Sequence, residues 1–111
     1  MSSSIQRLKG SIPPLITPFR NSEIDLESYA RLVNFQVEHG SHGILVNGTT
    51  SEPSTLTVEE RNRLIDTAME TVAGRVPVVA ATGSQSLAET KLLTDHAVTA
   101  GVDALLIVPP Y

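Results

Sequence analysis

The chain has 111 residues, enough for one hydrophobic core but not for two. Its formal net charge of −4 and its scattered arginines argue against a nucleic-acid surface or an anionic-membrane surface. It has no cysteine, which excludes disulfides and thiolate chemistry, and no apolar run of signal-peptide or transmembrane length, so we expect a cytoplasmic protein.

The first predicted element is a short strand over residues 12–18, preceded by an N-terminal extension over residues 1–9. Its three prolines have no N–H to donate, so the strand should be brief. A helix is expected after Asp25, which can cap it. The apolar residues of this helix fall on one stripe: Leu26, Tyr29, Ala30, Val33 and Val37.

The next strand is the apolar run Ile44–Val46, which leads through Asn47 into Gly48-Thr49-Thr50. At the end of a parallel strand, such a turn points two hydroxyls and several backbone N–H groups into a ligand crevice. The turn is therefore a candidate cradle for a small carboxylate or phosphate. The alternative is that both threonines only satisfy the turn itself.

Two more helix–strand units follow. A capping box at residues 57–60 begins a helix whose inward residues should be Leu64, Ile65, Ala68, Met69 and Val72. A strand over residues 76–80 comes next. A second capping box at residues 86–89 begins a helix with Leu92, Leu93, Ala97 and Ala100 on its inner side, and a strand over residues 104–108 ends the pattern.

The strands are apolar throughout, which is typical of parallel strands buried on both faces. A βαβαβαβ order fits a doubly wound sheet or part of a barrel. The G-x-G-x-x-G and Walker motifs are absent, which favours the barrel. We therefore predict an α/β fold, a (β/α)8 TIM barrel, with residues 10–111 as its N-terminal half: about the first four strands and three helices.

Four stretches resemble the dihydrodipicolinate synthase / N-acetylneuraminate lyase family of pyruvate-dependent class I aldolases. They are GSIPPLITPF at 10–19, GTTSE at 48–52, TVEER at 57–61 and VPPY at 108–111. Threonine at both positions 49 and 50 resembles the synthase branch. In this family a barrel lysine forms a Schiff base with pyruvate, and the resulting enamine reacts with an aldehyde.

The resemblance implies that Thr50 binds the pyruvate carboxylate and that Thr49, also in contact with substrate, takes part with Tyr111 in a proton relay. It also implies a homo-oligomer, a tetramer in many relatives, with no cofactor and no metal. The only lysines are Lys9, ahead of the first strand, and Lys91, in the middle of the third helix. Neither is placed to form the Schiff base.

We therefore expect the N-terminal portion of a lyase that condenses or cleaves pyruvate with an aldehyde, inactive without the rest of its barrel. One alternative is a non-catalytic half-barrel that binds a small anion or assembles with copies of itself. A second alternative is another 2-oxo acid aldolase of the same family. Neither nucleic acid nor a membrane is an expected partner.

Overall fold

The computed structural model describes residues 8–48 and 53–107. In chain order its elements are β1 (Phe19–Arg20), β2 (Glu23–Ile24), α2 (Leu26–Glu38), β3 (Ile44–Val46), the 3-10 turn η2 (Pro53–Thr55), α3 (Val58–Val72), β4 (Val78–Ala81), α4 (Leu87–Ala100) and β5 (Ala104–Leu106).

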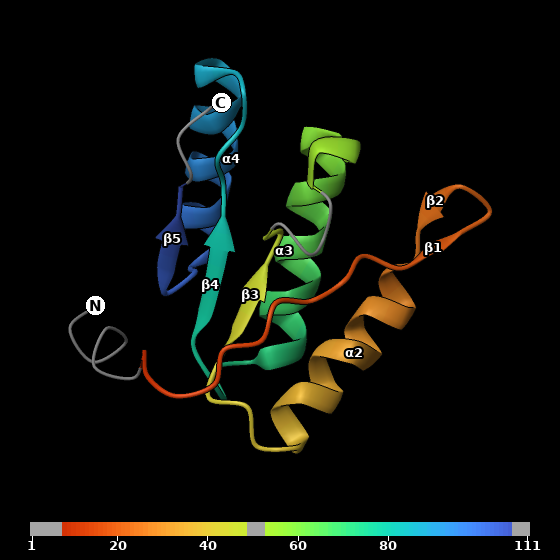
Figure 1. Cartoon of the computed structure of the whole chain (residues 1–111), viewed down its shortest axis with the longest axis vertical. Helices are drawn as coiled ribbons and strands as arrows, with labels where there is room; N and C mark the ends of the chain where they lie inside the picture. Colours follow the sequence, from red (N-terminus) through yellow and green to blue (C-terminus); the bar gives the residue numbers. More distant parts are fainter. Residues whose placement is uncertain (1–7, 49–52, 108–111) are drawn as a thin grey trace.

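Three parallel strands form the main sheet in the order β3-β4-β5, which is also their order along the chain. Ile44 pairs with Val78 between β3 and β4, and Val79 pairs with Ala104 between β4 and β5. One helix joins each pair of strands, and crossovers of the same hand place α3 and α4 on the same face of the sheet (Figure 1). The predicted parallel arrangement is confirmed.

A segment ahead of the hairpin lies beside β3 as a further extended piece of chain. The Leu45 amide donates to the Pro13 carbonyl at 3.1 Å, and the Leu15 amide donates to the Leu45 carbonyl at 3.3 Å. Their pairing amounts to an isolated parallel bridge between Pro14 and Leu45. Because Pro13 and Pro14 have no N–H to donate, the predicted first strand is present only as this short contact.

Strands β1 and β2 form an antiparallel hairpin that the sequence analysis did not anticipate. Phe19 pairs with Ile24 across it. At its tip, Asn21 and Ser22 have φ values of 51° and 68°. Two successive left-handed residues are what a type I′ hairpin turn requires. The strands are too short for an alternating apolar pattern to mark them in the sequence.

The three predicted helices, α2, α3 and α4, each begin directly after the residue that the sequence marked as a cap. Asp25 accepts a hydrogen bond from the amide three residues further on, at 3.0 Å. Thr57 and Glu60 form both halves of a capping box at the start of α3. The second predicted capping box is only half formed: Ser86 accepts from the Glu89 amide at 3.3 Å, but its own amide donates to the Ser84 hydroxyl instead of the Glu89 side chain.

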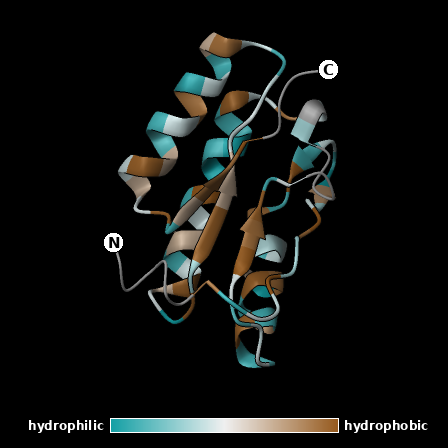
Figure 2. Cartoon of the chain, turned by 60° about the vertical axis from the view of Figure 1, so that its left-hand side comes forward, coloured by the Kyte–Doolittle hydropathy of each residue, from teal (hydrophilic) through white to brown (hydrophobic). Residues whose placement is uncertain are grey.

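The core lies between the sheet and α3, which packs against α2 on one side and α4 on the other (Figure 1). The buried residues of α3 and of the strands cluster there: Leu64, Ile65, Ala68 and Val72 with Ile44, Val46, Val78 and Ala80. Leu45 and Val79 alternate with these strand residues and are only half-buried, so the other face of the sheet is more open. Figure 2 shows the hydrophobic colour of the strands.

The apolar stripe predicted for α4 is partly wrong. Leu93 and Ala97 are buried as expected, but the Leu92 side chain is 60% exposed. Consecutive helix residues point about 100° apart. Seating Leu93 in the buried interface therefore turns Leu92 outward.

Candidate active site

The chain leaves β3 through Asn47, directly before the predicted anion-binding turn. Asn47 has a φ of 62°, a left-handed conformation that asparagine adopts more readily than most residues. Its side chain is buried, at 1% exposure, and its Nδ2 donates to the main-chain carbonyl of Arg61 at 3.0 Å. The end of β3 is thereby tied to the first turns of α3.

Gly48 follows, and its lack of a side chain has a steric reason. A Cβ at this position would lie 2.8 Å from Cδ2 of Leu45, which is closer than side-chain contacts allow. The predicted site residues Thr49 and Thr50 come next. Both lie outside the described residues, as does Tyr111, so their roles remain predictions.

Arg61 is the main component of the site that the sequence analysis missed. Its side chain is 3% exposed, and its Nη2 and Nη1 donate to the main-chain carbonyls of Ala81 at 2.8 Å and Gly83 at 3.0 Å. The sequence did contain a signal: Arg61 precedes Leu64 and Ile65 by three and four residues, so it lies on the buried stripe of α3.

The end of β4 also makes hydrogen bonds to β5 and to α4. The Thr82 amide donates to the Leu106 carbonyl of β5 at 3.2 Å, and the Thr82 hydroxyl accepts from the Thr94 hydroxyl of α4 at 2.9 Å. The Ser84 amide donates to the hydroxyl of Thr90 at 3.0 Å. Together with Arg61, these bonds link the carboxyl ends of three consecutive strands.

The electrostatics of this network come from one buried cation. Burial lowers the pKa of the Arg61 guanidinium, and the negative charge of Glu89 opposes that shift. The group stays protonated at neutral pH because the ordinary arginine pKa is so high. Within residues 8–48 and 53–107, no carboxylate lies within ion-pair distance of it. A buried positive charge therefore lies at the carboxyl end of β4, where uncharged main-chain carbonyls accept its hydrogen bonds.

Both lysines are exposed and away from the strand ends. Lys9 precedes the segment that bridges to β3, and Lys91 lies on the outer side of α4. In the part of the chain that the structure describes, no three His, Asp or Glu side chains are grouped to hold a metal ion. The described helices include none that is long and apolar enough to cross a membrane.

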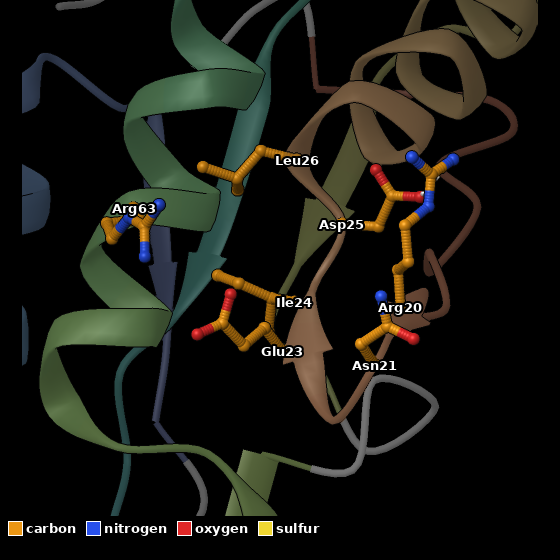
Figure 3. Close-up of a pocket in the computed structure, with 7 residues that line it drawn as sticks. All are labelled: Arg20, Asn21, Glu23, Ile24, Asp25, Leu26 and Arg63. Atoms are coloured by element: carbon orange, nitrogen blue, oxygen red, sulfur yellow. Dashed lines mark ion pairs between the residues drawn. The ribbon is translucent and has the colours of Figure 1, made fainter.

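A separate hollow of about 280 Å³ lies between the hairpin and α3. Figure 3 shows its lining, with Arg63 on α3 facing the hairpin residues. Arg20 and Asp25 approach to 3.5 Å, and Glu23 supplies a second carboxylate opposite the second guanidinium. Among the described lining residues, two guanidinium groups and two carboxylates balance in charge.

Alternating parallel strands and helices, with a tight turn and a polar network at the carboxyl ends of the strands, define a segment of a β/α-barrel protein whose site lies at those ends. The Dihydrodipicolinate synthetase family model matches residues 7–111, and the chain belongs to this family. The resemblance drawn from the sequence is confirmed.

Known proteins of this family are similar along nearly the whole chain. The 4-hydroxy-tetrahydrodipicolinate synthase of Thermus thermophilus is 50% identical over 103 residues, which are 93% of this chain and 34% of that protein. The crystal structure of dihydrodipicolinate synthase from Aquifex aeolicus matches with a TM-score of 0.89 at 45% identity, over 94% of this chain and 36% of that one.

N-acetylneuraminate lyase from Mycoplasma synoviae matches with a TM-score of 0.92 at 32% identity, over 96% of this chain and 38% of that one. These similarities confirm the barrel fold. The chain spans about a third of the length of the curated relatives it matches. The family thus includes a synthase and a lyase, both much longer than these 111 residues.

Proposed function

We propose that the chain supplies the N-terminal part of a Schiff-base-forming lyase that condenses or cleaves pyruvate with an aldehyde, most similar to 4-hydroxy-tetrahydrodipicolinate synthase. The main observation in support of this proposal is the family match over residues 7–111, with 50% identity to a protein of that name. Since the chain spans about a third of that relative, the activity belongs to the complete enzyme. Residues 1–111 alone should be inactive.

The proposed chemistry divides between this segment and the rest of the barrel. A lysine amine beyond residue 111 attacks the pyruvate ketone, water leaves, and the iminium accepts the electrons released when the methyl group loses a proton. Thr50 holds the pyruvate carboxylate through its N–H and hydroxyl, while Thr49 and Tyr111 relay protons. The position of Gly48 at the end of a parallel strand supports this assignment.

The partners in this proposal are small molecules and further copies of the chain. Pyruvate and an aldehyde are the substrates, no cofactor or metal is required, and the complete enzyme is a cytoplasmic homo-oligomer, a tetramer by family resemblance. One similar solved structure, with a TM-score of 0.87 at 39% identity, is described as a monomeric dihydrodipicolinate synthase variant. Sedimentation of the complete enzyme therefore tests the tetramer separately.

Borohydride trapping tests the central claim. The complete enzyme is incubated with pyruvate and borohydride, and the reduced adduct is weighed by intact mass spectrometry and mapped to a peptide. We expect one adduct per chain, on a lysine after residue 111, and no stoichiometric adduct on residues 1–111 alone. An adduct on Lys9 or Lys91 contradicts the proposal, and no adduct at all favours the non-catalytic half-barrel.

A second candidate is another 2-oxo acid aldolase of the same family. The structural match to an N-acetylneuraminate lyase, with a TM-score of 0.92, supports this second candidate. The two candidates share the pyruvate adduct but differ in the aldehyde. Condensation with aspartate semialdehyde supports the synthase, and cleavage of a longer 2-oxo acid supports the aldolase.

A further inference from the structure

We infer that Asn47 and Arg61 are positioning residues, which form a buried cross-link between the end of β3, the start of α3 and the end of β4. The inference rests on the proposed function, since the proposed carboxylate-binding residues follow Asn47 and Gly48 directly in the chain. By fixing the chain where it leaves β3, the cross-link sets the affinity for pyruvate.

The β3 half of the cross-link is a bond between distant parts of the chain. Asn47 Nδ2 donates to the Arg61 carbonyl at 3.0 Å, across 14 residues of sequence. The same residue holds the backbone at a φ of 62°, where the chain changes direction toward Gly48. One buried side chain therefore both shapes the start of the turn and anchors it to α3.

The β4 half depends on the shape of the guanidinium. Two nitrogens of Arg61 reach two carbonyls, those of Ala81 and Gly83, which are 20 and 22 residues away in the sequence. A planar guanidinium can hold two such acceptors at once. A lysine ammonium is a single point charge on a flexible stem and cannot reproduce that fork.

Further hydrogen bonds connect the cross-link at the end of β4 to β5 and to α4. Between the two bonded carbonyls, Thr82 donates its amide to the Leu106 carbonyl of β5 and pairs its hydroxyl with Thr94. A shift of α3 relative to β4 would therefore disturb the ends of three strands together. A misplacement of about 1 Å at a site can lower its performance about a hundredfold.

Three variants of the complete enzyme test the cross-link. Arg61→Met removes the fork and its charge, and Asn47→Gly removes the side-chain bond while still permitting a positive φ. The third carries both changes. The readouts are the pyruvate concentration that half-saturates borohydride trapping, and kcat and KM for pyruvate and for the aldehyde.

We expect each single variant to raise both the half-saturating concentration and KM for pyruvate about tenfold or more. KM for the aldehyde should change much less. Since both substitutions break one cross-link, the double variant should fall well short of the product of the two single effects. Arg61→Lys should restore only part of the affinity.

Arg75→Met is the matched control. Arg75 also donates to main-chain carbonyls, those of Thr71 and Val72, but it is exposed and lies ahead of the amino end of β4. Its substitution should leave pyruvate affinity unchanged. An equal rise in KM for Arg75→Met would overturn the inference, because it would show a general loss of stability.

The remaining outcomes are also decisive. If Arg61→Met does not fold, Asn47→Gly and Arg61→Lys carry the test. Folded variants with pyruvate affinity within twofold of the parent refute the cross-link while leaving the proposed function intact. Full restoration by Arg61→Lys refutes the role of the fork. A parent enzyme that forms no pyruvate adduct refutes the proposed function, and the inference falls with it.

Discussion

Two arginines, one near each end of the sheet, make similar hydrogen bonds in opposite surroundings. Arg61 is buried and binds carbonyls 20 and 22 residues away. Arg75 is exposed and binds the carbonyls of Val72 and Thr71, three and four residues away, as well as the Asn34 side chain on α2. The first joins α3 to the chain at the carboxyl end of β4, whereas two of the three bonds of the second stay within the end of α3.

The difference shows that sequence separation and burial decide how far a substitution is felt. When a buried donor is removed, the carbonyl groups that it bonded are left without a hydrogen bond, because water cannot replace the donor there. This loss costs more free energy than losing the same bond at the surface. We therefore expect function to be sensitive at the carboxyl ends of the strands and tolerant at the amino ends. Three substitutions test this contrast, and a fourth tests the cost of burying a polar group without a partner.

The largest effect should come from Thr49→Val in the complete enzyme. Valine has a similar shape but no hydroxyl, so the proposed proton relay is broken. Turnover should fall about a hundredfold or more, with pyruvate affinity little changed. Steady-state kinetics measure both, and Thr49→Ser, which keeps the hydroxyl, should retain most of the turnover. Unchanged turnover in Thr49→Val would reduce the turn to a structural role.

Thr50→Ala should mainly weaken pyruvate binding. Loss of one charge-assisted hydrogen bond to a carboxylate costs about 1.5–3 kcal/mol, which corresponds to a rise in KM of about ten- to a hundredfold. Thr71→Ala is the control near the amino end of β4, since the Thr71 hydroxyl donates to the Thr67 carbonyl of its own helix. Equal kinetic effects of the two substitutions would erase the contrast between the two ends.

Gly48→Ala should destabilise the fold by about 1–3 kcal/mol, because the added Cβ overlaps the Leu45 side chain. Shortening the neighbour with Leu45→Val should remove part of that cost, as measured by denaturant unfolding of the single and double variants. Gly74, with a φ of 78° and open space around it, provides the comparison. The destabilisation caused by Gly74→Ala should come from backbone strain, so Leu45→Val should not reduce it. A reduction there would contradict this distinction.

The smallest effect should be a gain of stability from Tyr29→Phe. Tyr29 is fully buried, and its hydroxyl has no hydrogen-bond partner among the residues that the structure describes. Burial also raises the pKa of its phenol. Removing the hydroxyl should raise the free energy of unfolding by about 1 kcal/mol, measured by denaturant titration. A loss of stability would show that the hydroxyl is satisfied, as the Arg61 fork is.

Much of the fold could be predicted because its signals are local. A capping side chain bonds an amide three residues away, so Asp25 and Thr57 marked the starts of two helices within one turn. Continuous apolar runs marked β3, β4 and β5 and indicated parallel pairing. The proposed substrate residues Thr49, Thr50 and Tyr111 came from family resemblance and remain predictions, since they lie outside the described residues.

The missed features depend on groups that are distant in sequence or on very short elements. Arg61 could have been placed on the buried stripe of α3 from its spacing to Leu64, but nothing nearby in the sequence indicates which acceptors it would find. The β1–β2 hairpin rests on two left-handed residues, and its strands are too short to show a period.

The order of the elements, the helix starts and the family can be read directly from the chain, because caps, apolar periods and motifs act over a few neighbouring residues. The role of Arg61 cannot be read in this way. Its carbonyl partners are brought within 3.0 Å only when α3 packs against the sheet, and only burial there gives those bonds their importance. Long-range packing therefore determines which polar residue supports the site.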